Sequence, residues 1–220
     1  MTLSTLHLVL AILVPIAFLI GGIPFGVLIA KRRGVDLKTF GSGNVGATNA
    51  GRALGKRFFF VVLALDALKA LVPAAVASTL VHTQSTPDDR TALTFALWMA
   101  VGVSAVLGHV FSPFLGFKGG KGVACGLGLV LGTVPVLTLP GLVALAIFVA
   151  VFKVTRYISL GSMISAAVLP VAYVALALLL SWPMSTQWPV LAVLVLVALL
   201  VLWRHRDNLR RLRDGTEVAT

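Results

Sequence analysis

The sequence predicts an all-α, polytopic membrane protein, and three observations lead to this fold class. Hydrophobic residues make up 59% of the 220 residues and charged residues only 11%, whereas a soluble domain is about one-quarter charged. The apolar residues gather in long runs without Asp, Glu, Lys or Arg. The remaining segments are basic, with 18 Lys and Arg in the chain against 7 Asp and Glu. We expect one integral-membrane domain over residues 1–220.

The apolar runs are long enough to cross a bilayer as helices, which takes roughly 20 residues. They are Leu8–Ala30, Thr91–Phe117, Gly122–Phe152 and Ile158–Trp203. No Lys or Arg precedes the first run, and the run is longer than the ~7–15 apolar residues of a signal peptide, so we expect it to remain as a helix. The single cysteine, Cys125, lies in an apolar run and predicts neither a disulfide nor a metal site.

Two basic clusters orient the chain, because Lys and Arg gather on the cytoplasmic side of a membrane. Seven bases lie within residues 31–57 and five within residues 204–213. After the first cluster, Phe58–Val81 is the next expected span, and it leads to a turn at His82–Arg90 that carries two aspartates against one arginine. This turn is expected outside, and Leu93–Leu115 then returns the chain to the cytoplasmic side.

The run Gly122–Phe152 decides the topology. As one helix, its 31 residues would be about 46 Å long against a bilayer core of about 30 Å, and the basic residues that follow would lie outside. Two short helices with a turn near residues 132–140 keep every basic cluster inside. Ile158–Leu180, an outer turn at Ser181–Pro189 and Pro189–Trp203 complete the chain. We therefore expect seven transmembrane helices, with the N-terminus outside and the C-terminus cytoplasmic.

Three polar segments are expected on the cytoplasmic face, and each suits an anion. Gly41–Asn49 alternates glycines with Ser, Thr and Asn and is followed by Arg52; such a backbone can turn its N–H groups toward an anion. Gly116–Gly122 carries two lysines and enters a helix, whose N-terminus attracts negative charge. Lys153–Ser162 places two cations beside hydroxyl groups. Each segment also has a simpler explanation, as a flexible turn or as cations at a helix end.

Two charges within the second span form a separate feature. Asp66 and Lys69 lie one helical turn apart, and charges inside a membrane cost about 2.5–3.5 kcal/mol each and normally mark function. Their mutual pairing is the structural alternative, and both interpretations can hold together. His109 before the second polar segment, and His205 and Asn208 in the basic tail, are further candidates for the same site.

These segments together indicate a polyanionic substrate at the membrane surface, because cations there outnumber acids. A nucleic-acid partner is not expected, since the chain has only two Tyr and no soluble domain to carry such a surface. An anion transporter is the main alternative. It would need polar or broken helices at the midplane, whereas the spans are nearly devoid of polar residues outside Asp66 and Lys69. A structural scaffold would leave the basic motifs without a role.

The motifs resemble, in the same order, those of the bacterial acyl-phosphate:glycerol-3-phosphate acyltransferases, the PlsY family. The resemblance extends from about Pro24 to Glu217. The motifs are Ser42-Gly43-Asn44-x-Gly46-Ala47-Thr48-Asn49-x-x-Arg52, Asp66-x-x-Lys69, Gly108-His109 with Gly116-Phe117-Lys118-Gly119-Gly120-Lys121-Gly122-Val123-Ala124, Ser159-Leu160-Gly161, and Arg204-His205-x-x-Asn208-x-x-Arg211-Leu212. The proline of Phe111-Ser112-Pro113 departs from the family pattern, which concerns helix packing and leaves the site assignment unchanged.

The resemblance implies seven helices around a site that faces the cytoplasm of a bacterium, in its inner (plasma) membrane. It implies glycerol 3-phosphate as acceptor and acyl phosphate as donor, with membrane lipids around the protein. The sequence has no metal-ligand cluster, so no metal or other cofactor is expected. The products would be lysophosphatidic acid and inorganic phosphate, and neither acyl-CoA nor acyl carrier protein would be the direct donor.

Five residues are expected to be catalytic: Ser42, Arg52, Lys121, Ser159 and His205. The residues expected to bind substrate are Gly43, Asn44, Gly46, Thr48, Asn49, Lys69, His109, Lys118, Gly119, Gly120, Arg156, Ser162 and Asn208. The first four catalytic residues would contact phosphate or acyl phosphate, and His205 with Asn208 would hold the acceptor. Direct attack by the acceptor hydroxyl is expected, without an acyl-enzyme. The general base is open between His205, His109 and a substrate phosphate oxygen.

Overall fold

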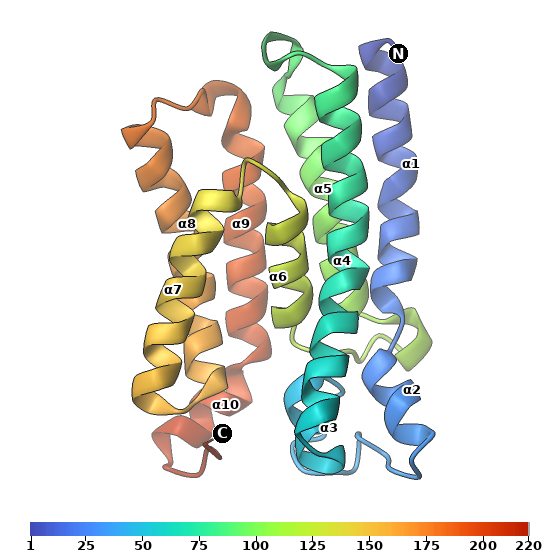
Figure 1. The fold of residues 1–220 in the computed structure, drawn as a ribbon, viewed down its shortest axis with the longest axis vertical. Helices are drawn as coiled ribbons and strands as arrows, with labels where there is room; N and C mark the ends of the chain where they lie inside the picture. Colours follow the sequence, from blue (N-terminus) through green and yellow to red (C-terminus); the bar gives the residue numbers. More distant parts are fainter. Residues whose placement is uncertain (220) are drawn as a thin grey trace. The chain divides into compact units, whose positions relative to one another are not determined.

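The computed structural model describes residues 1–219, and every regular element in that range is a helix. The elements, in chain order, are α1 Leu3–Gly22, α2 Phe25–Lys31, α3 Ala47–Leu54, α4 Lys56–Gln84, η1 Pro87–Asp89, α5 Ala92–Val110, η2 Pro113–Leu115, α6 Val123–Gly132, α7 Thr138–Thr155, α8 Ile158–Leu179, α9 Met184–Arg204 and α10 Arg206–Arg213 (Figure 1). The predicted all-α class is confirmed.

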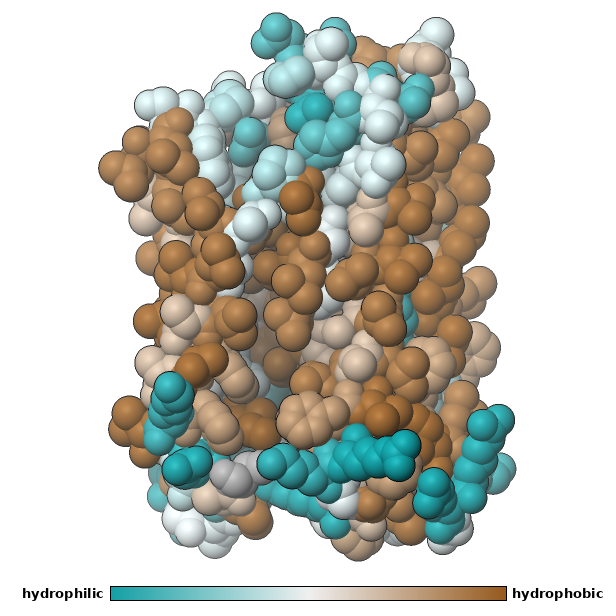
Figure 2. Space-filling model, in the orientation of Figure 1, coloured by the Kyte–Doolittle hydropathy of each residue, from teal (hydrophilic) through white to brown (hydrophobic). Residues whose placement is uncertain are grey.

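Six helical segments of the described chain are long and apolar enough to cross a membrane. They are Leu3–Lys31, Lys56–Gln84, Ala92–Leu115, Thr138–Thr155, Ile158–Leu179 and Met184–Arg204. Hydrophobic residues cover the flanks of the helices, and hydrophilic residues gather at their ends (Figure 2). The chain is therefore built as a polytopic membrane protein.

The run that was expected to decide the topology forms two helices. α6 ends at Gly132 and α7 begins at Thr138, so the chain breaks inside the predicted turn region. α6 has only 10 residues, which makes it about 15 Å long, half of a bilayer core. The count of seven spans and their orientation stay predictions.

Two predicted boundaries are wrong. The first apolar run ends as a helix at Gly22 and resumes at Phe25, because Pro24 has no N–H and favours an extended conformation in the residue before it. The last span begins at Met184 and contains Pro189, because a membrane helix accommodates proline where its surroundings satisfy the freed backbone groups.

The chain forms two compact units, and each has its own helix packing. The first comprises Met1–Asp89 and Leu97–Thr133, and the second comprises Arg90–Ala96 and the chain from Val134 onward. In the first unit, α4 packs against α1, α3 and α6. α6 approaches α4 so closely that a Cβ on Gly128 would overlap the carbonyl oxygen of Ala67, as is usual where small residues join membrane helices. In the second unit, α8 packs against both α7 and α9.

Candidate active site

The loop before α3 is folded around the side chain of Asn49, which lies in the first turn of that helix and is 1% exposed. Its Nδ2 donates to the carbonyl oxygens of Leu37, Phe40 and Asn44 at 3.1, 3.0 and 2.8 Å. Its Oδ1 accepts from the backbone N–H of Ser42 at 3.2 Å. One buried amide thus fixes the path of the first glycine-rich segment.

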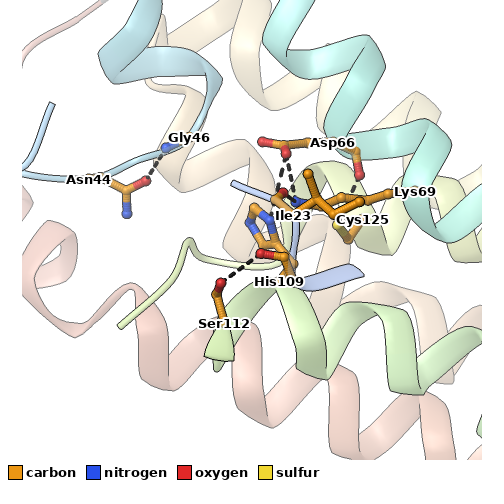
Figure 3. A network of polar contacts seen from close by, with 9 residues as sticks. Ile23, Asn44, Gly46, Asp66, Lys69, His109, Ser112 and Cys125 are labelled. Carbon is orange, nitrogen blue, oxygen red and sulfur yellow. Dashed lines mark hydrogen bonds and ion pairs between the residues drawn. The ribbon is translucent and has the colours of Figure 1, made fainter. Parts of the chain in front are cut away.

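Of the other candidates in this loop, some stabilise its conformation and others are exposed to solvent. Asn44 Oδ1 accepts from the N–H of Gly46 at 2.9 Å, just before α3 begins (Figure 3). Gly43 has φ +68°, a conformation that favours glycine. Ser42 and Arg52 are both exposed, and Thr48 is half-buried. Ser42 and Arg52 are therefore the candidates that a substrate can reach from solvent.

The second glycine-rich segment lies directly on His109 at the end of α5. The N–H groups of Gly119 and Gly120 donate to the carbonyl oxygens of Val110 and His109, both at 3.0 Å. A Cβ on Gly119 would overlap the His109 carbonyl oxygen, and a Cβ on Gly120 would overlap its Nε2. Glycine is thus required at both positions by close approach, and both N–H groups are already engaged with α5.

Lysines and helix N–H groups remain as the anion-binding groups of this segment. Lys118 is exposed and Lys121 is half-buried. Gly122 has φ +86° and precedes the first residue of α6, so the chain turns from the loop into the helix at that point. The first N–H groups of a helix have no partner within it and attract negative charge.

A buried ionic group lies between α1, α4, α5 and α6. Lys69 Nζ lies 2.8 Å from Asp66 Oδ1 and donates to the carbonyl oxygen of Ile23 at 2.9 Å. His109 Nδ1 is 3.8 Å from the same carboxylate oxygen, and Cys125 Sγ donates to the backbone oxygen of Asp66 at 2.9 Å (Figure 3). Asp66 is 2% and Lys69 4% exposed.

This ionic group holds the break between α1 and α2. Lys69 satisfies the carbonyl of Ile23, and Ser112 Oγ donates to the carbonyl of Gly22 at 2.6 Å. Asp66, Lys69, His109 and Ser112 line a recess with room for about one water molecule. The mutual pairing of Asp66 and Lys69, considered above as a structural alternative, is therefore present. The candidate Lys69 is engaged in the fold.

In the second unit, Glu217 joins two of the predicted site residues. Its Oε1 accepts from Ser159 Oγ at 2.7 Å and from Asn208 Nδ2 at 2.6 Å. Its Oε2 accepts from Arg211 Nε at 2.7 Å, and the N–H groups of Thr216 and Glu217 donate to the carbonyl of Arg211 at 2.8 and 3.2 Å. The tail thus folds back onto α10 and links it to α8.

These contacts also set the charge of the carboxylate. Partial burial acts to raise the pKa of Glu217, but the hydrogen bonds from Ser159, Asn208 and Arg211 and the charge of Arg211 outweigh it. The net effect holds the pKa below its ordinary value, because bonds to the charged form favour ionisation. Glu217 is therefore a carboxylate at neutral pH.

The remaining candidates of this unit lie on neighbouring helix ends. His205 is buried between α9 and α10, and its Nδ1 lies 2.8 Å from the carbonyl of Val201. A carbonyl can only accept, so Nδ1 carries a proton and a neutral ring has its lone pair on Nε2. Ser162 is buried and donates to the carbonyl of Ile158 at 2.8 Å. Arg156 follows the last residue of α7 and is exposed.

Glu217 is the functional candidate that sequence reasoning did not select. It lies in a basic tail, and its contact with Ser159 spans 58 positions. The local sequence offered one hint: Glu217 is a carboxylate at the end of the stretch that resembles the family, directly after an arginine-rich helix.

Comparison with known proteins shows one consistent match. A family model described as glycerol-3-phosphate acyltransferase matches residues 11–215. A glycerol-3-phosphate acyltransferase of Geobacter sulfurreducens is 44% identical over 208 residues, which cover 94% of this chain and 95% of the relative. One from Aquifex aeolicus is 40% identical over 205 residues, covering 93% and 96%.

Two crystal structures of PlsY (YgiH), an integral membrane glycerol 3-phosphate acyltransferase, are similar in fold. Both are 36% identical to this chain and match 96% of it. The glycerol 3-phosphate form has a TM-score of 0.80 over 95% of its own chain, and the lysophosphatidic acid form has 0.77 over 94%.

Proposed function

The chain belongs to the glycerol-3-phosphate acyltransferase family, and from this premise we propose that it transfers a fatty acyl group from acyl phosphate to glycerol 3-phosphate. The acceptor's primary hydroxyl receives the acyl group, and lysophosphatidic acid and inorganic phosphate are released, as the first step of bacterial phospholipid synthesis. The observation that carries the proposal is a relative 36% identical over 96% of the chain, whose crystal structures include a glycerol 3-phosphate form and a lysophosphatidic acid form.

Acyl phosphate suits a site built from cations and neutral donors. It is a mixed anhydride, so phosphate is a good leaving group. The acceptor oxygen bonds to the carbonyl carbon, the bond from that carbon to the phosphate oxygen breaks, and the hydroxyl proton passes to a phosphate oxygen of a bound substrate. Positioned donors stabilise the carbonyl oxygen as charge develops on it and on the departing phosphate.

Ser42, Arg52 and Lys121 contact the donor's phosphate. This assignment is supported by their exposure, since Ser42 and Arg52 are exposed and Lys121 is half-buried. They belong to segments with a fixed backbone: hydrogen bonds to Asn49 hold the first segment, and hydrogen bonds to the end of α5 hold the second. Such fixed geometry is what positioning of a reactive phosphate requires.

His205 and Asn208 hold the acceptor. Ser159 was expected to contact phosphate, but its hydroxyl already donates to Glu217, so we assign it to the acceptor instead. Ser159 donates its proton to Glu217, so its oxygen remains able to accept a hydrogen bond from a substrate hydroxyl. Ser162 donates to a helix carbonyl. Neither hydroxyl gives its proton to an imidazole, which supports direct attack over an acyl-serine intermediate, because a serine nucleophile needs an adjacent base.

The test of the reaction is made with purified protein in detergent. Acyl phosphate and glycerol 3-phosphate together should release phosphate and give lysophosphatidic acid by mass spectrometry, whereas acyl-CoA or acyl-carrier protein in place of acyl phosphate should give neither. Formation of lysophosphatidic acid from acyl-CoA and glycerol 3-phosphate, without acyl phosphate, would overturn the proposed donor. A stable acyl adduct formed without acceptor would overturn direct attack.

We also propose seven spans in a bacterial inner membrane, with the N-terminus outside and the polar segments in the cytoplasm. The basic clusters support this orientation. In a Cys125→Ala background, a cysteine at Thr138, where α7 begins, should react with an impermeant thiol reagent from outside. A cysteine at Thr155, where α7 ends, should not. The reverse pattern would place the third polar segment outside.

A further inference from the structure

One exposed side of α10 is not used by the proposed reaction, and we propose that it binds the headgroups of anionic phospholipids at the membrane surface. This face is made by Arg206, Leu209, Arg210 and Arg213, and it is called the arginine face below. All four side chains are exposed.

Helix geometry and the contacts of Glu217 fix the direction of the arginine face. Its residues are spaced i, i+3, i+4 and i+7, so they lie on one side of a helix. Asn208 and Arg211, on the other side, hold the carboxylate of Glu217. Because those contacts set the rotation of α10 about its axis, the three arginines are turned away from the Glu217 cluster.

The arginine face follows directly after a membrane span. α9 ends at Arg204 and α10 begins at Arg206, so the first arginine lies within one turn of the end of the span. Trp203, in the last turn of α9, is 47% exposed, and the guanidinium groups of Arg204 and Arg206 lie 5.6 and 5.1 Å from its ring centroid. Tryptophan beside cations is typical of the headgroup level of a membrane.

An apolar side chain among the arginines favours a lipid over other anions. Leu209 is 58% exposed on the arginine face, and a leucine beside basic residues is the composition of helices that lie in a membrane interface. A guanidinium group binds phosphate oxygens in pairs. Of the three arginines, Arg213 also contacts Asp214, at 3.2 Å, but an ion pair this exposed contributes little and does not block a phosphate.

The experiment uses the full chain in detergent and two photoreactive lipid probes with identical acyl chains, one phosphatidylglycerol and one phosphatidylcholine. Labelling of the α10 peptide is measured by mass spectrometry as each probe is titrated. Phosphatidylglycerol should label α10 at a far lower concentration than phosphatidylcholine. The triple variant Arg206→Gln, Arg210→Gln, Arg213→Gln should need about 100-fold more phosphatidylglycerol, because each base near an anionic surface contributes about fivefold.

Two controls keep the result interpretable. Removing three exposed bases elsewhere, in Arg32→Gln, Lys38→Gln, Lys56→Gln, should leave labelling of α10 unchanged. If the α10 triple variant does not fold, as judged by its thermal unfolding, the three single variants decide, each with an expected loss of about fivefold.

Equal labelling by the two probes, or unchanged labelling of the triple variant, would overturn the proposal. Displacement of the phosphatidylglycerol probe by a DNA oligonucleotide but not by unlabelled phosphatidylglycerol would assign the face to nucleic acid instead, and would overturn it as well. Labelling does not depend on turnover, so either failure leaves the acyltransferase assignment as it stands.

Discussion

Two side chains, the buried Asn49 and the partly buried Glu217, organise the two polar regions of the molecule, and they do so with different chemistry. Asn49 donates three hydrogen bonds and accepts one within the loop before α3. Glu217 accepts three, from Ser159, Asn208 and Arg211. The amide is neutral, so its bonds do not depend on pH, whereas protonation of the carboxylate weakens its hydrogen bonds and removes its charge attraction to Arg211.

The two anchors also differ in reach. Asn49 binds backbone groups within 12 positions of itself, so it stabilises one local loop. Glu217 binds side chains on α8 and α10, and its contact with Ser159 spans 58 positions. The first anchor therefore shapes the backbone that presents Ser42. The second anchor, Glu217, holds the C-terminal tail and α10 against the start of α8.

Both anchors bind groups of the protein itself, so the largest loss should come from a side chain that we propose to contact the donor. Lys121→Ala should lower kcat/KM by at least about 100-fold, because losing one partner of a buried charge contact costs about 2–5 kcal/mol. Lys31→Ala, at an exposed base of the first cluster, should change kcat/KM only a few-fold. Near-normal turnover of folded Lys121→Ala protein would remove the second polar segment from the site.

Asn49→Ala should follow, with a loss of about 50-fold in kcat/KM. It leaves the carbonyls of Leu37, Phe40 and Asn44 without their shared donor, and each unsatisfied buried group costs about 1–3 kcal/mol. The matched control is Asn44→Ala, which removes a single hydrogen bond, to Gly46, and should lose less. Equal losses in the two variants would show that Asn49 has no special role in holding the loop.

The two anchors show what sequence could and could not predict. The segment Gly41–Asn49 was recognisable from its composition, and Asn49 was predicted to bind substrate. The sequence gives the residue type but not the direction of its side chain, and the structure engages its amide within the loop. Glu217 was missed for another reason, since its partner Ser159 is remote in sequence and three-dimensional folding alone brings them together.

The helices were more predictable than these contacts, because apolar runs report burial in lipid directly. The division of Gly122–Phe152 into two helices followed from length and charge. The break at Pro24 did not enter the prediction, although a proline restricts the residue before it. What no pattern in the run revealed is that Lys69, from another helix, caps the broken end at Ile23.

Glu217→Gln tests the second anchor, and we expect a loss of about 10-fold in kcat/KM for glycerol 3-phosphate. The amide keeps one acceptor oxygen but replaces the other with a donor, and hydrogen bonds to a charged group contribute about 1.5–3 kcal/mol. The matched control is Asp214→Asn, at the exposed pair with Arg213, which should leave kinetics unchanged because exposed ion pairs contribute little. Parallel losses in both variants would mean that tail charge matters and the Glu217 contacts do not.

The smallest effect, and the one that separates the anchors most directly, is expected from acidification. The pKa of Glu217 is lowered in the folded chain from an ordinary value of 4.5. Its contribution to stability is therefore complete above about pH 4.5 and is lost as pH falls through the lowered pKa. The protection factor of the N–H of Thr216, which donates to Arg211, is its exchange rate compared with that of an unfolded chain at the same pH, and it should fall a few-fold over that window. At the N–H of Ser42, which donates to the neutral amide of Asn49, it should show no such step. The acid step should also be missing in Glu217→Gln, because glutamine does not titrate. A step of the same size in that variant would assign it to another carboxylate and remove the proposed difference between the anchors.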